Sequence, residues 1–156
     1  MKRRSIPLLF IPAAALAVTA MAGVPANGSP SIESDATAPA MRMKFFQTPS
    51  GNIRCGMFRT SGKWSMRCDI YDHSWVAPPR PTPCDFGDYG SSVGMSRKGS
   101  PRFLCVSDAM DGGSTLTYGK SLQYGPFFCR SRPKGLKCFN AGGRGWFLSR
   151  QSYDLF

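Results

Sequence analysis

The sequence is poor in the residue types that build most catalytic and metal centres. It holds one histidine, His73, and one glutamate, Glu33, among 156 residues. It has no C-x-x-C motif, and 12, 15, 20, 23 and 8 residues separate its successive cysteines. Zinc sites use cysteines two to four residues apart and thiol redox centres use C-x-x-C, so the spacing argues against both. A phosphate-cradling G-x-x-x-x-G-K-[ST] motif is also missing, and we expect no cofactor.

Beyond the N-terminal region, no apolar run is long enough to span a membrane. Residues 1–22 have the layout of a signal peptide, with a charged start, an apolar centre and the small-x-small sequence Ala20-Met21-Ala22. A second cleavage position follows Ala26. The apolar centre is short and contains two prolines, so we expect no transmembrane anchor. The protein is therefore predicted to be exported, either secreted or associated with the cell wall.

The remaining chain divides into a lead and one folded domain. Residues 23–40 are rich in Pro, Ala and Ser, cannot bury enough apolar surface to order themselves, and are predicted to be disordered. Residues 41–156 contain 17 Lys and Arg against 7 Asp and no Glu, a formal charge of +10. Such a charge favours anionic surfaces through long-range steering. We expect a monomer whose partner is an anionic envelope polymer or an acidic protein, and not intracellular nucleic acid.

Alternating apolar residues predict a hairpin over residues 53–70. A tight turn at Ser61-Gly62 places Cys55 opposite Cys68, which predicts a cross-strand disulfide. The same register predicts four further pairs, namely Ile53 with Ile70, Met57 with Met66, Arg54 with Asp69, and Arg59 with Trp64 in a cation–π contact. A shift by one residue would break all of these pairs at once.

A second hairpin is predicted around the turn at residues 132–135, with Cys129 opposite Cys138. By elimination Cys84 joins Cys105, since an even number of cysteines in an exported chain predicts a disulfide framework. Residues 75–84 predict an extended crossover, and a third hairpin is expected around residues 97–100. Turn glycines and prolines recur every 8 to 12 residues with no helical period. The sequence therefore predicts a mostly β, antiparallel domain of short strands stapled by three disulfides.

The segment 90–94 matches the G-x-S-x-G pattern of serine hydrolases, with Ser92 at its centre. In that motif the serine lies on a strand-to-helix elbow and the histidine follows it. Here no helix is predicted and His73 precedes Ser92, so we interpret the segment as a turn that enters a strand. Three D-x-x-D pairs lack the alternating calcium loop, and no metal site is expected. These pairs are Asp69/Asp72, Asp85/Asp88 and Asp108/Asp111.

A cationic binding surface is the leading functional hypothesis. Strand alternation places Arg54 and Arg67 on the outer face of the first hairpin, near Arg59 and Lys63. We predict that a non-enzymatic binding protein contacts its anionic partner through these four residues.

Two other functions stay open. His73 neighbours Asp72 and Asp69, and a histidine oriented by a carboxylate could act as the general base of a small extracellular hydrolase. Alternatively, a stapled loop, either RTSGK at 59–63 or RPKG at 132–135, could enter the cleft of an enzyme as a secreted inhibitor.

Several strings together resemble a family of small exported proteins of high-GC Gram-positive bacteria, classed as a domain of unknown function. These strings are FFQTPSGNIRCGM, MRCDI, HSWVAPPRP, GLKCFNAGGRGWFLSR and the terminal YDLF. The resemblance covers about residues 45–156. It implies secretion and a shared disulfide framework, and it implies no activity, substrate or catalytic residue.

Overall fold

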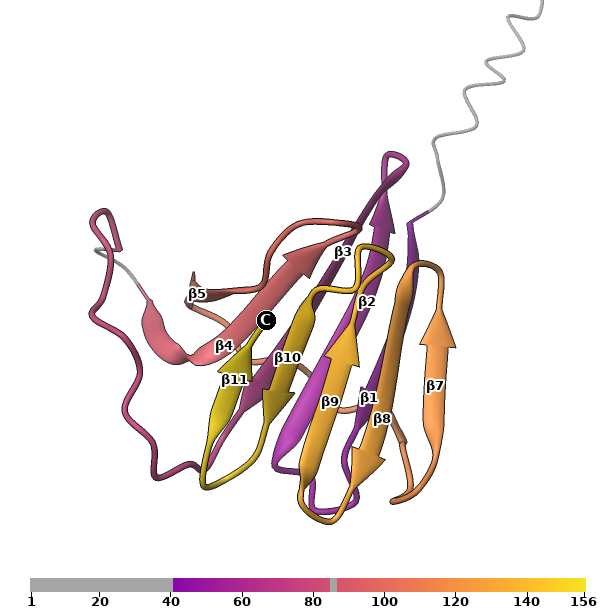
Figure 1. Ribbon diagram of the computed structural model, residues 1–156. Coiled ribbons are helices and arrows are strands. Elements are labelled where there is room, and N and C mark those ends of the chain that lie inside the picture. Colours follow the sequence, from indigo (N-terminus) through magenta and orange to yellow (C-terminus); the bar gives the residue numbers. More distant parts are fainter. Residues whose placement is uncertain (1–40, 85–86) are drawn as a thin grey trace, which may run out of the picture. The chain divides into compact units, whose positions relative to one another are not determined.

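The computed structural model describes residues 41–84 and 87–156. The predicted signal peptide at 1–22, the predicted lead at 23–40 and Asp85 lie outside these residues. The described residues form eleven β-strands and no helix, which confirms the predicted fold class (Figure 1). Consequently, this part of the chain has no helix that could cross a membrane.

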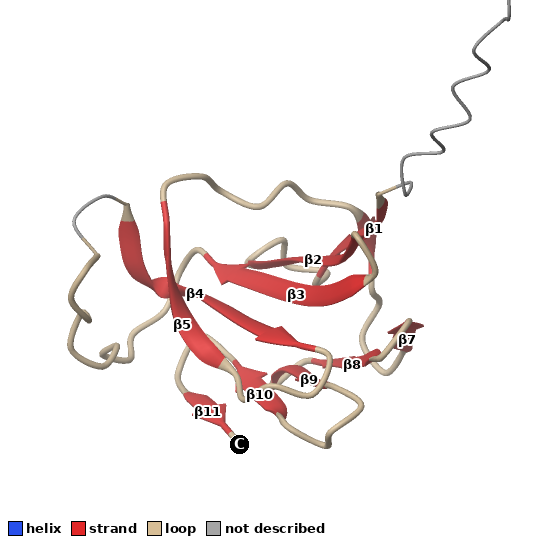
Figure 2. Ribbon diagram, turned by 90° about the horizontal axis from the view of Figure 1, so that it is seen from above, coloured by secondary structure: helices blue, strands red, loops and turns tan. Residues whose placement is uncertain are grey.

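The strands form two sheets (Figures 1 and 2). Sheet A has the spatial order β5-β4-β3-β2-β1-β6 and sheet B the order β11-β10-β9-β8-β7. The strands of sheet A are β1 (Arg42–Gln47), β2 (Ile53–Thr60), β3 (Lys63–Ile70), β4 (Asp88–Ser96), β5 (Arg102–Val106) and β6 (Ser114–Thr115). Those of sheet B are β7 (Ser121–Tyr124), β8 (Phe127–Arg132), β9 (Gly135–Phe139), β10 (Gly145–Leu148) and β11 (Tyr153–Leu155).

Each sheet is a meander, because strands that neighbour each other in space also follow each other along the chain. The consecutive pairs are all antiparallel. Strand β6 departs from this pattern, because the chain returns across sheet A and β6 pairs parallel with β1. Consecutive antiparallel strands need only short turns. The predicted hairpin around residues 97–100 is confirmed as β4–β5.

The first hairpin, β2–β3, has the predicted register at every position, including Cys55 opposite Cys68. Its two turn residues, Ser61 and Gly62, have φ angles of 48° and 76°. A two-residue turn with both angles positive matches the right-handed twist of the flanking strands. The predicted cation–π contact also forms, with the Arg59 guanidinium 5.7 Å from the centre of the Trp64 ring.

All three predicted disulfides are present. Cys55–Cys68 and Cys129–Cys138 each join residues that lie directly opposite each other, with Cα atoms 4.1 Å apart. This is slightly closer than the usual lower limit of about 4.4 Å for disulfides. The third bond, Cys84–Cys105, spans 5.9 Å between Cα atoms and ties the β3–β4 connection to β5.

The two sheets share one core, to which every strand but β6 contributes apolar side chains from one face. Both cross-strand disulfides are fully buried there, and Cys129 Sγ lies 4.0 Å from Met66 Sδ across the gap between the sheets. The largest buried side chains are Trp146, Phe46 and Phe127. The sulfur atoms thus form part of the contact between the sheets as well as links within them.

The β3–β4 connection carries the chain past the edge of sheet B, as expected for a crossover without regular structure. The Trp75 indole donates a hydrogen bond to the carbonyl of Ser149 (2.9 Å), and its ring lies 4.6 Å from that of Tyr153. This contact holds the connection against the β10–β11 turn.

We predict that replacing both Cys129 and Cys138 by alanine lowers the free energy of unfolding by about 3 kcal/mol, because the nine-residue loop is no longer closed in the unfolded chain. Urea denaturation of the oxidised protein and the double variant measures the difference. An unchanged midpoint would show that this bond contributes nothing to stability.

Candidate binding face

The outward side chains of sheet B are set by its buried ones. Strand β8 buries Phe127, Cys129 and Ser131, so Phe128 and Arg130 point to the other side of the sheet. The same alternation applies to β9, β10 and the chain end. We call the resulting outward surface the Phe–Lys face. It consists of Phe128, Arg130, Lys137, Phe139, Phe147 and Phe156.

Three of the four phenylalanines lie in one row across the strands. Phe128 is opposite Phe139, and their rings stack with centres 5.0 Å apart. Phe139 is in turn opposite Gly145, which exchanges both backbone hydrogen bonds with Phe156. A side chain at Gly145 would collide with the Cys138 carbonyl, so this position stays empty. The row therefore lacks a side chain between Phe139 and Phe156, and Gly145 itself is buried.

The next row, which we call the cationic row, holds two cations, one ring and, at its far end, the carboxylate of Asp154. Arg130 lies directly opposite Lys137, and Lys137 is followed by Phe147 and then Asp154. The Lys137 ammonium lies 4.6 Å from the centre of the Phe156 ring, which links the two rows. Like charges placed opposite each other destabilise an antiparallel pair. The stability of the sheet therefore gives no reason for this arrangement.

The Phe–Lys face is open to solvent. Both ribbon views show sheet B as an outer layer of the domain, with no described strand packed against its far side (Figures 1 and 2). Phe139 is 37% exposed and Phe156 is 39% exposed, while Arg130 and Lys137 are both exposed. Exposed apolar side chains grouped with polar ones are typical of interaction surfaces. Chemically, the face offers flat rings for stacking beside two cations.

The outer face of sheet A, which the sequence favoured, is largely occupied by its own contacts. Arg67 donates to Asp69 at 2.7 Å and to Asp108 at 2.9 Å, and its side chain is 14% exposed. Burial by itself would lower the pKa of Arg67, but the hydrogen bonds to the two carboxylates raise it above its ordinary value. Its charge is thus already neutralised within the protein.

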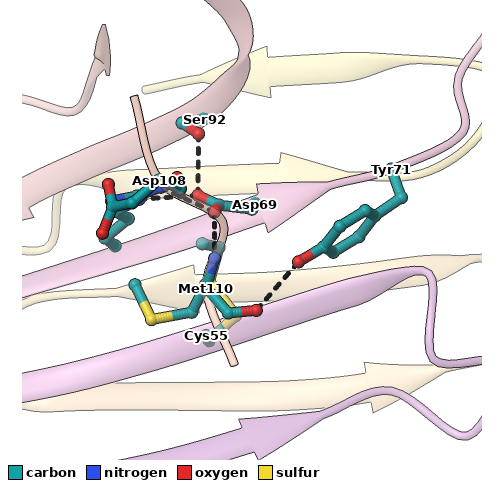
Figure 3. Close-up of polar contacts among 8 residues, drawn as sticks. Cys55, Asp69, Tyr71, Ser92, Asp108 and Met110 are labelled. Carbon is teal, nitrogen blue, oxygen red and sulfur yellow. Dashed lines mark hydrogen bonds and ion pairs between the residues drawn. A yellow bond between two sulfur atoms is a disulfide. The ribbon is translucent and has the colours of Figure 1, made fainter. Parts of the chain in front are cut away.

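Asp69 is the centre of this network (Figure 3). Besides the two hydrogen bonds from Arg67, its carboxylate accepts one from the Ser92 hydroxyl (2.7 Å) and one from the Met110 amide (2.8 Å). Tyr71 donates to the Met110 carbonyl at 2.8 Å. Together these bonds hold residues 107–113, between β5 and β6, on the outer face of sheet A.

The other predicted cations on the first hairpin have different surroundings. Arg54 lies opposite Asp69 as predicted, but the ion pair of Asp69 forms with Arg67, and the Arg54 guanidinium lies 4.7 Å from the Tyr71 ring centre. Arg59 and Lys63 are exposed at the hairpin tip. Two of the four cations are therefore open to a ligand.

The residues considered for a hydrolase site each contact a different partner. His73 stacks on Trp75 with ring centres 3.7 Å apart, and Asp72 forms an ion pair with Arg150 at 2.9 Å. Ser92 is buried on β4 and its hydroxyl bonds to Asp69. The segment 90–94 lies entirely within β4, whereas we expected a turn that enters a strand. Within the described residues, no hydrogen bond joins His73 to Asp72 or Asp69.

A family comparison covers most of the chain. A model for a family of unknown function, DUF6636, matches residues 29–156. The chain belongs to this family. No curated protein and no solved structure matches the chain. No activity is attached to the family, so the surfaces of the domain are the basis for inferring its function.

We predict that Asp69→Ala lowers the free energy of unfolding by about 3 kcal/mol, since it leaves the Met110 amide and Ser92 without their acceptor and removes one partner of Arg67. The matched control Asp111→Ala alters an exposed carboxylate in the same loop and should change stability by no more than about 0.5 kcal/mol. Equal effects in urea denaturation would contradict this role for Asp69.

A second prediction concerns acid stability. The Arg67 guanidinium lowers the pKa of Asp108 below its ordinary value of 3.8. A carboxyl whose pKa is lower in the folded state stabilises the protein above the unfolded pKa, and this contribution disappears as pH falls through the folded pKa. The melting temperature of the wild type should therefore fall more steeply than that of Asp108→Asn between about pH 5 and pH 2. Parallel curves would show that the Arg67–Asp108 pair does not affect stability.

Proposed function

We propose that this DUF6636 protein is an exported, non-enzymatic binding module that engages an anionic polymer of the cell envelope through the Phe–Lys face. The observation that carries the proposal is the pairing of an exposed aromatic row with a cationic row on one open sheet face. Arg130 and Lys137 lie opposite each other there without a carboxylate within 4 Å of either in the described part of the chain.

The chemistry of the face suits a ligand with repeated anionic groups and flat units. Neighbouring strands are about 4.8 Å apart, so a chain lying across β8 and β9 meets an aromatic ring or a cation on each strand. The anionic groups neutralise Arg130 and Lys137, and ring-shaped units stack on the phenylalanines. An acidic protein is the other partner that the charge of the domain allows. We favour the polymer because a repeating ligand matches the repeating rows.

The expected location supports this partner. The predicted signal peptide directs export, and disulfides persist in the oxidising surroundings outside the cytoplasm. A net charge of +10 over residues 41–156 also draws the domain toward anionic wall material.

The test compares two charge reversals in the purified mature protein. Arg130→Asp with Lys137→Asp should abolish most binding to isolated anionic wall polymer in a sedimentation assay, whereas Arg59→Asp with Lys63→Asp should bind like the wild type. Both double variants lower the net charge by the same amount. Wild-type binding should also weaken steeply between about 50 and 500 mM salt, because charges are screened beyond about 8 Å near physiological ionic strength.

Melting curves of both variants serve as the control that they are folded. Equal loss in the two variants would mean that total charge, not the Phe–Lys face, causes binding. Loss only in the Arg59/Lys63 variant would place the site on the first hairpin. Phe139→Ala supplies an uncharged check, since it should weaken binding at every salt concentration by removing one stacking ring.

A further inference from the structure

Three turns meet at one end of the domain around a cavity of about 200 Å³. They are the β1–β2 turn at 48–52, the β8–β9 turn at 133–134 and the β10–β11 turn at 149–152. Each turn brings a cation or hydrogen-bonding side chains to the cavity. We call this cavity the end pocket. Its wall includes Arg132, Lys134, Arg150, Ser50, Asn52 and Tyr118.

The end pocket is strongly cationic. Three cations line it and no Asp or Glu does. Within the described residues, Arg132 and Lys134 have no carboxylate within 4 Å, and Arg150 has only Asp72, at 2.9 Å. The Arg150 and Asp72 side chains are 57% and 66% exposed, and such surface pairs contribute little. Three like charges on the wall of one small cavity favour an anionic ligand.

The turns that carry these cations are held in place without a ligand. The register of β8–β9, with Arg132 opposite Gly135, fixes the position of Lys134 at the hairpin tip. The Ser149 hydroxyl donates to the Ser152 carbonyl at 2.9 Å and closes the β10–β11 turn. The backbone of these turns therefore needs no reordering when a ligand binds, which lowers the conformational entropy lost on binding.

A second anchor fixes the remaining wall. The Asn52 side chain makes two hydrogen bonds to the backbone of Asp72, at 2.8 and 2.9 Å. These bonds attach the β1–β2 turn to the residue that pairs with Arg150. The Asn52 amide is therefore used by the fold, and uncharged donors for a ligand are supplied by the Ser50 and Tyr118 hydroxyls and the Gln151 amide.

The structure assigns the end pocket as a site for a single phosphate group, either the free ion or a monoester. Its volume is below the range of about 300–1,000 Å³ typical of drug-sized ligands, so it fits one compact group and not a polymer segment. Arginine side chains bind phosphate oxygens through paired hydrogen bonds, and lysine adds a point charge. The phosphate could be the free ion or belong to a sugar or glycerol phosphate. None of the residues of the Phe–Lys face lines the end pocket, so this assignment does not depend on the proposed polymer binding.

The experiment titrates the folded protein with inorganic phosphate, glycerol phosphate and galacturonate, and follows the backbone amide signals of Asn52 and Gly135 by NMR. We expect saturable shifts with both phosphates and at least about tenfold weaker binding of the carboxylate sugar. Tighter binding of glycerol phosphate than of the free ion would identify an ester as the natural source, and the reverse order would identify free phosphate.

Lys134→Ala should weaken phosphate binding about tenfold, the effect of losing one charged hydrogen bond. The matched control Lys98→Ala removes an exposed turn lysine far along the chain from the end pocket and should bind like the wild type. The Arg130/Lys137 reversal should also bind phosphate normally, which separates this test from that of the Phe–Lys face. Absence of saturable shifts, equal weakening in Lys134→Ala and Lys98→Ala, or equal affinity for galacturonate would each overturn the assignment.

Discussion

The inward position of the Cys129–Cys138 disulfide determines the character of sheet B. Both half-cystines are completely buried, and the bond lies against Met66 of the opposite sheet. Because side chains alternate along a strand, the residues on either side of each cysteine must face outward. Phe128, Arg130, Lys137 and Phe139 therefore point outward as a direct result of where the disulfide lies, with Phe128 half-buried and the other three exposed. The same constraint that staples the core creates the Phe–Lys face.

The two outer faces differ because only one of them is covered by the chain itself. On sheet A, Asp69 draws residues 107–113 onto the strands, neutralises Arg67 and buries Met110 (Figure 3). A cavity of about 480 Å³ also lies on that sheet, but Arg67, one of the two cations that line it, is already bound to carboxylates. On sheet B, the corresponding cations keep their full charge. Openness and unpaired charge, and not the size of a cavity, distinguish the candidate face.

The end pocket arises from the meander topology. In a meander every second turn lies at the same end of the sheet, so the β1–β2, β8–β9 and β10–β11 turns meet where the two sheets come together (Figure 1). Basic residues that are far apart along the chain, Arg132 and Arg150 among them, thereby line one cavity. The domain thus presents cations in two geometries. The end pocket, at the turns, is concave, and the outward face of sheet B is flat.

The sequence by itself determined the strand class, the register of both disulfide hairpins and all three cysteine pairs. The strand class and the two hairpin disulfides depend on period-two alternation and on turns a few residues long, which are local properties of the chain. The third pair, Cys84–Cys105, followed only by elimination from the even number of cysteines. The sequence also placed Arg54 opposite Asp69, but it could not show that the ion pair of Asp69 forms with Arg67. Which arginine pairs with Asp69 depends on Asp108 and the Met110 amide, some forty residues away along the chain. Only the tertiary structure decided which outer face stays open and which turns meet. Both depend on how the sheets pack and where the 107–113 segment folds back, and neither leaves a periodic signal in the sequence.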